Sequence, residues 1–305
     1  MSGLIFIFVC ITVGKILSRL TNPQELIRSL NLLVVRVALP ALILDKIHSI
    51  NLAGDAFFPI ATPWIGFAVA VAAIYFIKLF VPMSKITTGC LILLCGTSNT
   101  SFVGFTLVHA LLGEQDLHTA IIVDQSNLIV LFTLGILVAN LYSGKSVDVK
   151  QMLIRILVYP PVVALILGIL LRPFAYPEAV QYTLSTFGSL LTPLTMLSIG
   201  CSLTLPRDKS MIKFISIGLT IKLIVMPLAI ALLALFVFTT LSPLTAAVSI
   251  MQVGMAPMVM AVIIAADKNL NPELANFLTS IGIPISFITA VLWNILLPFA
   301  QATAH

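Results

Sequence analysis

The stretch Cys95–Gly104, CGTSNTSFVG, sets six small or polar residues in a row inside an otherwise apolar segment. The chain reads CLILL just before it and FTLVHALLG just after it. In hydrocarbon, every polar group without an internal partner costs several kcal/mol, so such a stretch persists only inside protein or beside water. We therefore interpret it as an interruption in a membrane-spanning helix.

Composition indicates that lipid is the solvent for most of the chain. Of its 305 residues, 60% are hydrophobic and 9% are charged, against about 25% charged in a typical soluble domain. Apolar runs of about 18 or more residues recur from end to end, and each can cross about 30 Å of hydrocarbon as a helix. The sequence thus predicts an all-α polytopic membrane protein and excludes a soluble one.

Polar and Pro/Gly junctions divide the chain into ten predicted spans. The first is expected to be a span and not a cleavable signal, because MSGLIFIFVCITVG has neither a basic n-region nor a small-residue cleavage site. The ten spans cover residues 3–20, 26–48, 58–81, 86–112, 116–142, 152–172, 179–203, 211–238, 243–266 and 273–300.

Lysine and arginine predict the orientation of these spans. Only Lys46 and Arg172 lie in loops on one side, and twelve basic residues lie on the other. Under the positive-inside rule the richer side is cytoplasmic, which places the protein in the plasma (cytoplasmic) membrane with both termini outside the cytoplasm. The twelve are Lys15, Arg19, Arg28, Lys78, Lys85, Lys145, Lys150, Arg155, Arg207, Lys209, Lys213 and Lys268.

The two halves of the chain are similar to each other. LPALILDKIHSINL (39–52) and TPLTMLSIGCSLTL (192–205) share four residues at one offset, which in apolar segments can also arise by coincidence. A second interruption, MQVGMAPM (251–258), lies in the ninth span as the first lies in the fourth. We predict a five-helix repeat at 1–142, a cytoplasmic link at 143–151 and a second repeat at 152–305. Because five is odd, the second repeat is inverted.

Inverted repeats with interrupted helices are the best sequence pointer to the central site of a transporter. Each half-helix N-terminus carries about half a positive charge, which suits a carboxylate. The alternative is a small-residue face that packs closely against a neighbouring helix. Asn99 is our first candidate for substrate binding, and the others are Thr97, Ser98, Thr100, Gln125, Gln252, Gly254 and Pro257.

Four motifs in order resemble the auxin efflux carrier family, the bacterial relatives of the plant PIN transporters. They are LNLLVVRVALPALIL (30–44), NTSFVGFTL (99–107), IKLIVMPLAI (221–230) and GMAPMVMAVIIA (254–265). The resemblance implies ten helices in two inverted five-helix repeats, with the fourth and ninth broken and crossing, as in sodium/proton antiporters and bile-acid symporters. It also implies elevator-type movement and export or exchange of organic anions. Ser101 and Thr106 depart from the family, which has Gly and often Pro there.

Three charged residues lie deep in predicted spans: Arg36, Asp124 and Lys222. A charge at such depth is a functional hypothesis by default. Burial disfavours the ionised form of a carboxyl, so Asp124 is a candidate proton carrier. Arg36 and Lys222 are candidate counter-charges, either for Asp124 or for an anionic substrate. The alternative is a permanent ion pair that fixes helix packing.

The sequence therefore predicts a secondary transporter of a small organic anion, coupled to a proton, to sodium or to the membrane potential alone. The alternatives are a sodium-coupled symporter of the bile-acid-symporter type, an intramembrane enzyme or a channel. Enzyme function is not expected, because the clustered catalytic motifs and a P-loop are missing from the sequence. The expected partners are the anion, a proton or sodium, membrane lipid and a second copy of the chain, with no nucleic acid, cofactor or metal.

Overall fold

A computed structural model of the protein describes residues 2–20, 22–46, 56–113, 117–144, 154, 157–202, 211–238 and 241–296. Every regular element in these ranges is a helix, which confirms the predicted all-helical class for this part of the chain. The first half contains α1 (Ser2–Leu20), α2 (Pro23–Leu33), η1 (Val34–Ala38), α3 (Leu39–Lys46), α4 (Phe57–Lys78), α5 (Lys85–Gly96), η3 (Thr100–Gly104), α6 (Phe105–Leu112), α7 (Leu117–Val130), η4 (Leu131–Gly135) and α8 (Ile136–Ser143).

The second half contains nine helical elements in the described ranges, several of them continuous with one another. They are α10 (Pro160–Leu171), α11 (Glu178–Ser189), α12 (Leu191–Ser202), α13 (Ile212–Thr220), η6 (Ile221–Val225), α14 (Met226–Phe236), α15 (Pro243–Val253), α16 (Val259–Asp267) and α17 (Pro272–Leu296). The elements labelled η are single π-helical turns, which often mark functional sites.

Six continuous helices are long and apolar enough to cross a membrane: Pro23–Lys46, Phe57–Lys78, Leu117–Ser143, Glu178–Ser202, Ile212–Phe236 and Pro272–Leu296. Four shorter apolar helices accompany them, at Lys85–Gly96, Thr100–Leu112, Pro160–Leu171 and Pro243–Val253. The chain is therefore a multi-pass membrane protein. Of the predicted cytoplasmic link, 145–151 lies outside the described residues, as do Lys145, Lys150, Arg155, Arg207 and Lys209.

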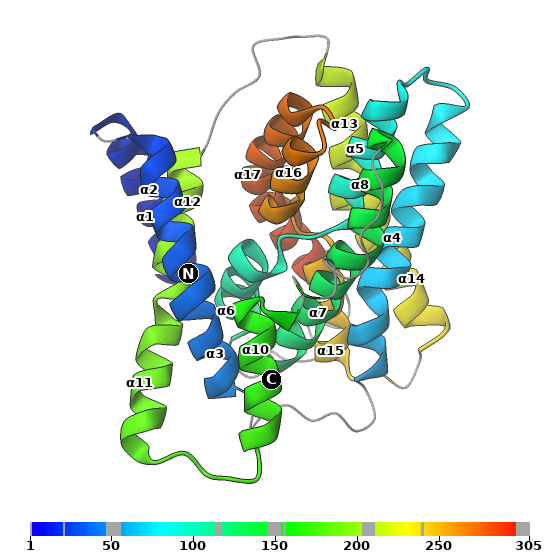
Figure 1. The fold of residues 1–305 in the computed structure, drawn as a ribbon. Helices are drawn as coiled ribbons and strands as arrows, with labels where there is room; N and C mark the ends of the chain where they lie inside the picture. The colour runs from blue at the N-terminus through cyan, green and yellow to red at the C-terminus, as the bar shows by residue number, and fades with distance from the viewer. Residues whose placement is uncertain are drawn as a thin grey trace.

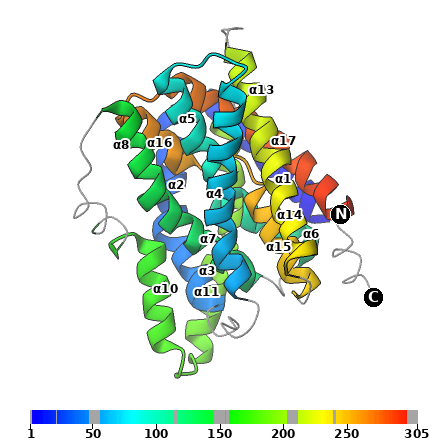
Figure 2. The ribbon, with the colours of Figure 1, turned by 90° about the vertical axis from the view of Figure 1, so that its right-hand side faces the viewer.

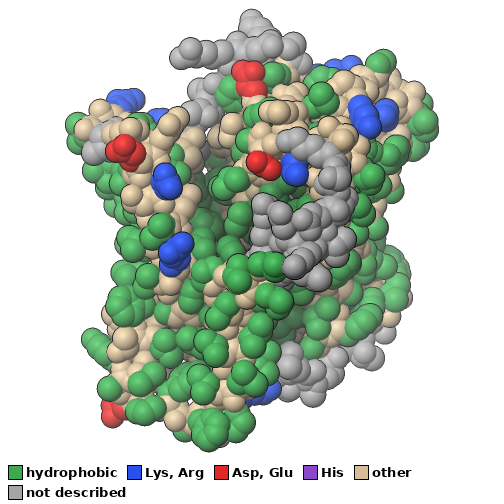
Figure 3. All heavy atoms as spheres, in the orientation of Figure 1, with side chains coloured by type: hydrophobic (Ala, Val, Ile, Leu, Met, Phe, Trp, Pro, Cys, Tyr) green, Lys and Arg blue, Asp and Glu red, His purple; other side chains and the backbone are tan. Residues whose placement is uncertain are grey.

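The helices form two groups (Figure 1). In the first group, α12 packs along α1 and α2, and α10 and α11 pack against α3. The second group contains α4–α8 and α13–α17, and α4 lies across α5, α7, α14 and α15 (Figure 2). A large apolar core of α4, α5, α7, α13–α17 residues holds the second group together. The Lys and Arg side chains visible in Figure 3 gather mostly toward the upper end of the molecule.

Two glycines allow the closest helix contact in the first group. A Cβ atom on Gly14 of α1 would lie 2.2 Å from the carbonyl oxygen of Leu197, and one on Gly200 of α12 would lie 2.1 Å from that of Ile11. Between helices in lipid, such small residues let backbones approach and so supply most of the packing. The α1–α12 contact therefore depends on both glycines.

We expect Gly200→Val to lower the thermal unfolding temperature in detergent, because the new side chain meets backbone that cannot move aside. Overpacking of this kind costs about 1–3 kcal/mol. Val13→Ala on the exposed face of α1 is the control and leaves the unfolding temperature nearly unchanged. Equal unfolding temperatures for Gly200→Val and the parent would contradict this account of the α1–α12 contact.

Candidate functional site

The two interrupted segments meet each other at the centre of the second group. The backbone leaves the helix at residues 97–99, after α5, and at 254–258, after α15. Ser98 and Pro257 pair as an antiparallel bridge, and the Asn99 N–H donates to the carbonyl oxygen of Ala256 at 2.8 Å. We call residues 97–99 and 254–258 the crossing. Both interruptions predicted from the sequence thus lie where the helices break.

Asn127 of α7 holds the first strand of the crossing in place. Its Oδ1 accepts from the Ser98 N–H at 3.1 Å, and its Nδ2 donates to the Ser98 carbonyl at 2.8 Å. The side-chain amide thereby takes the place of a neighbouring backbone segment, because it satisfies both backbone groups of one buried residue. The sequence places Asn127 with Gln125 in a polar patch beside Asp124, but it does not indicate the hydrogen bonds to Ser98.

Asp124 of α7 is fully buried and accepts three hydrogen bonds. Thr100 Oγ1 donates to its Oδ1 at 2.5 Å, Ser101 Oγ donates to the same oxygen, and Gln125 Nε2 donates to its Oδ2 at 3.1 Å. Ser101 thus has a specific role at a position where the resembling family has Gly. Because Thr100 and Ser101 open η3, the carboxyl group lies at the positive end of this half-helix.

Thr106, the second departure from the family pattern, continues the helix. Its Oγ1 donates to the carbonyl oxygen of Phe102 one turn earlier, at 3.2 Å. The break after α5 therefore covers only residues 97–99, and η3 and α6 follow it without a second interruption.

Lys222 of η6 is also fully buried and reaches the other side of the crossing. Its Nζ donates to Ser98 Oγ at 2.6 Å and lies 3.9 Å from Met226 Sδ. Ser98 Oγ in turn donates to the carbonyl oxygen of Val253 at 3.0 Å. Within the described part of the chain, no ion pair joins Asp124 to either predicted counter-charge, and Arg36 is exposed on η1. The structure brings Lys222 to the site but not Arg36.

Several buried polar atoms around the crossing lack a hydrogen-bond partner among the described residues. They are Asn99 Nδ2, Gln125 Oε1 and both side-chain amide atoms of Gln252. A Cβ atom on Gly104 would lie 2.0 Å from Gln252 Oε1, so a larger residue at position 104 would displace this amide from its place beside η3. Buried polar atoms are almost always paired in folded proteins, so such a cluster is suited to a polar ligand or ordered water.

The remaining candidates have local roles in the structure. Thr97 Oγ1 donates to the carbonyl of Leu93 at 2.9 Å, within its own helix. Asn99 Oδ1 accepts from the Phe102 N–H at 3.3 Å and so caps η3. Gly254 follows the last residue of α15, and Pro257 lies 3.1 Å from the position of a Cβ atom on Gly282.

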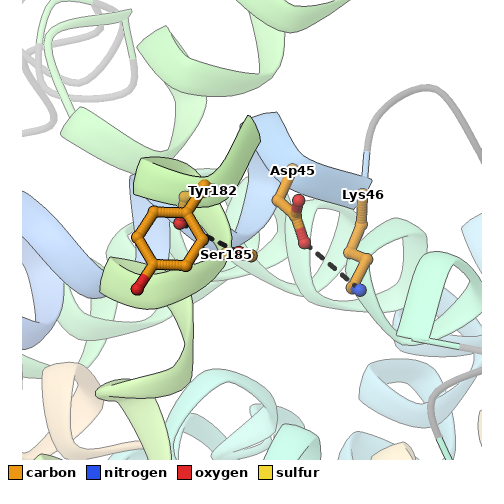
Figure 4. Close-up of polar contacts among 4 residues, drawn as sticks. All are labelled: Asp45, Lys46, Tyr182 and Ser185. Carbon is orange, nitrogen blue, oxygen red and sulfur yellow. Dashed lines mark hydrogen bonds and ion pairs between the residues drawn. The ribbon is translucent and has the colours of Figure 1, made fainter. Parts of the chain in front are cut away.

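Two cavities lie between the helix groups, toward opposite ends of α1 and α12. The larger, of about 1580 Å³, is lined by the early part of α2, the last turn of α12, α16 and α17, and it reaches Phe102 of η3. The smaller, of about 530 Å³, is lined by the end of α3, the α11–α12 junction and α6. The ion pair of Asp45 with Lys46, 3.2 Å apart, lies at the smaller cavity near Ser185 (Figure 4).

A cluster of apolar side chains lies at the crossing and includes Met255 and Ala256. Val103 of η3 and Leu107 of α6 belong to the same cluster as Met196 of α12 and Met251 of α15. All four are fully or almost fully buried, and neither cavity is lined by Asn99, Asp124 or Lys222. The polar side chains of Asn99, Asp124 and Lys222 are thus buried, although helix residues next to the crossing border each cavity. Among the described residues, no cluster of three His, Cys, Asp or Glu side chains could hold a metal.

Comparison with known proteins gives one family over nearly the whole chain. Residues 1–294 match the family described as "Membrane transport protein". An uncharacterized transporter of Methanothermobacter thermautotrophicus is 22% identical over 296 residues, which cover 95% of this chain and 96% of that protein. An uncharacterized transporter of Methanocaldococcus jannaschii is 32% identical over 121 residues, 38% of this chain and 39% of that protein.

Proposed function

Because the chain belongs to this membrane transport protein family, the auxin efflux carrier family that its motifs resemble, we propose that it is a secondary carrier for a small organic anion, in particular a carboxylate. The observation that carries the proposal is the charge distribution at the crossing. Four helix ends lie at the crossing: the C-termini of α5 and α15 and the N-termini of η3 and α16. Side chains of the protein interact with the first three, and the N-terminus of α16 has no side-chain cap.

The end without an internal partner is the N-terminus of α16. Asn99 caps η3 and Asp124 lies beside it, whereas Met258, which precedes α16, makes no side-chain cap. The C-terminal ends of α5 and α15 lie near Lys222 through Ser98. A carboxylate at the start of α16 would thus find unpaired backbone N–H groups and the positive end of a helix dipole.

Further groups at this position are suited to a carboxylate. Val259, the first residue of α16, lines the larger cavity together with Thr279, whose Oγ1 is buried and has no hydrogen-bond partner among the described residues. Asn99 lies close to the start of α16, because its backbone N–H donates to the carbonyl oxygen of Ala256, two residues before Met258. Its side-chain Nδ2 has no hydrogen-bond partner among the described residues. We therefore propose that the anion enters from the larger cavity and binds between α16 and Asn99.

The two cavities support an alternating-access mechanism of the elevator type. In our proposal the second helix group carries the crossing past the first group, so that the site opens to each cavity in turn. Lys15 and Arg28 line the larger cavity, and both belong to the basic set predicted to be cytoplasmic. We therefore assign the larger cavity to the cytoplasmic side, with both termini outside the cytoplasm.

The inverted repeat of residues 1–142 and 152–305 is part of the same proposal. The helix breaks of the two halves lie within the fourth and ninth predicted spans, and they pair as antiparallel segments. Asp124 is the proposed proton carrier, because its three hydrogen-bond donors are neutral and remain compatible with one protonated oxygen.

Asn99→Ser is expected to abolish stabilisation of the protein by its carboxylate ligand without loss of fold. Serine keeps an oxygen that caps η3 but lacks the amide nitrogen, whereas Asn99→Ala loses both and also costs about 1 kcal/mol of helix capping. The measurement is a thermal-shift panel of mono- and dicarboxylates, indole acids and bile acids. Thr88→Val, at the start of α5, is the control. Undiminished ligand shifts in Asn99→Ser would remove Asn99 from the site.

A further inference from the structure

Lys222 carries a charge that the proposed anion site does not use. Its side chain is fully buried and lines neither cavity. In the described part of the chain its ammonium group has no carboxylate within ion-pair distance. Removing an ammonium from water costs several kcal/mol, so a buried lysine requires compensating negative charge or strong hydrogen bonds.

The compensation comes from oxygen atoms and helix ends. Ser98 Oγ accepts from Nζ at 2.6 Å, and it can do so because its own hydrogen is donated to the Val253 carbonyl. Ser98 follows the last turn of α5, and Val253 is the last residue of α15. Each helix C-terminus carries about half a negative charge, so two of them together balance about one cation. The charge of the Lys222 ammonium group is therefore balanced by the C-termini of α5 and α15.

This environment is also the one that binds a small metal cation. Sodium in transporters is held by unwound carbonyls and the C-terminal ends of half-helices, with hydroxyl oxygens as additional ligands. Met226, the other neighbour of Nζ, is a weak ligand for a hard cation. The oxygen-bearing side of the crossing therefore has the charge and ligand type of a monovalent cation site, and the lysine side chain already fills it.

We propose that the Lys222 ammonium is a tethered cation that replaces a free monovalent cation at the crossing, so that this carrier neither binds nor requires sodium. The statement that transport does not require sodium rests on the proposed carrier function. The statement that the protein does not bind sodium does not, since cation binding is measurable without any substrate. Direct contact of Lys222 with the anion is the competing role. The burial of Lys222 away from both cavities and its hydrogen bond to Ser98 favour the role of internal cation.

The test is thermal unfolding of the purified protein in detergent, in the chlorides of sodium, ammonium, ethylammonium and choline at equal ionic strength. The parent protein is expected to unfold at the same temperature in sodium as in choline. Lys222→Ala, which removes both charge and side chain, is expected to unfold at a lower temperature in choline and to regain about 4 °C or more in sodium, ammonium or ethylammonium. Lys222→Met fills the same space without charge and is expected to show no cation response.

Three results would overturn the proposal. One is sodium-specific stabilisation of the parent protein, and another is a folded Lys222→Ala variant that responds to none of the small cations. The third is a Lys222→Met variant that loses stabilisation by carboxylates alone, which would place Lys222 in the anion site. If Lys222→Ala does not fold, the parent protein decides, because its indifference to sodium is itself required. None of the cation measurements contains an organic anion, so their failure leaves the proposed function untouched.

Discussion

Asn127→Ala is expected to lower the free energy of unfolding by about 2–6 kcal/mol, because it strands two buried backbone groups at about 1–3 kcal/mol each. The Ser98 N–H and carbonyl both bond to the Asn127 side chain, at 3.1 and 2.8 Å. Water does not replace the lost amide easily, since Ser98 and Asn127 are both buried. The measurement is the unfolding temperature in detergent, together with the fraction of monodisperse protein.

Two further variants make this expectation specific. Asn127→Asp keeps the acceptor for the Ser98 N–H but places a carboxylate oxygen against the Ser98 carbonyl, so it is expected to destabilise as well. Asn140→Ala is the control, because Asn140 is buried on α8 and its side-chain oxygen has no partner among the described residues. A loss in Asn127→Ala no greater than that in Asn140→Ala would show that Asn127 does not support the crossing.

Asp124→Asn is expected to reduce transport driven by a pH gradient by at least about tenfold, within the range of measured coupling energies, while substrate exchange continues. The substitution removes the proposed protonation site but preserves the shape of the side chain. Asparagine Oδ1 can accept from Thr100 and Ser101 as the carboxyl oxygen does. If the Gln125 amide turns over, its unpaired Oε1 accepts from the new amide nitrogen.

Asp124→Ala provides the contrast, since it leaves the donors of Thr100, Ser101 and Gln125 without their acceptor. We expect this variant to lose stability as well as transport. Uptake into proteoliposomes with and without an imposed pH gradient measures the first effect, and the unfolding temperature measures the second. Full gradient-driven uptake by Asp124→Asn would end the role of Asp124 as proton carrier.

The sequence revealed the helices and their two breaks because composition and local chemistry determine both. Six small or polar residues in a row cannot share one helix face, and Gly254 and Pro257 both disfavour a regular helix. Period and length then separate one apolar span from the next. The pairing of Ser98 with Pro257 needed the structure, because it joins residues far apart in the chain.

The distinction between Arg36 and Lys222 was beyond the sequence for a physical reason. Both lie deep in predicted spans, and both lie in π-helical turns, η1 and η6. One extra residue in a turn rotates all later side chains by about 100° relative to a regular helix, so helical periodicity no longer indicates which face a residue occupies. The structure shows that Lys222 is buried at the crossing and that Arg36 is exposed.

Counterflow in proteoliposomes tests the central claim most directly. Vesicles are loaded with an unlabelled carboxylate that stabilises the protein in the thermal-shift panel, and uptake of the same labelled compound from outside is followed. A carrier that alternates around the crossing gives uptake that saturates with concentration and is accelerated by the internal anion, and Asn99→Ser abolishes it. Uptake that rises linearly with concentration and ignores the internal anion would contradict the carrier mechanism.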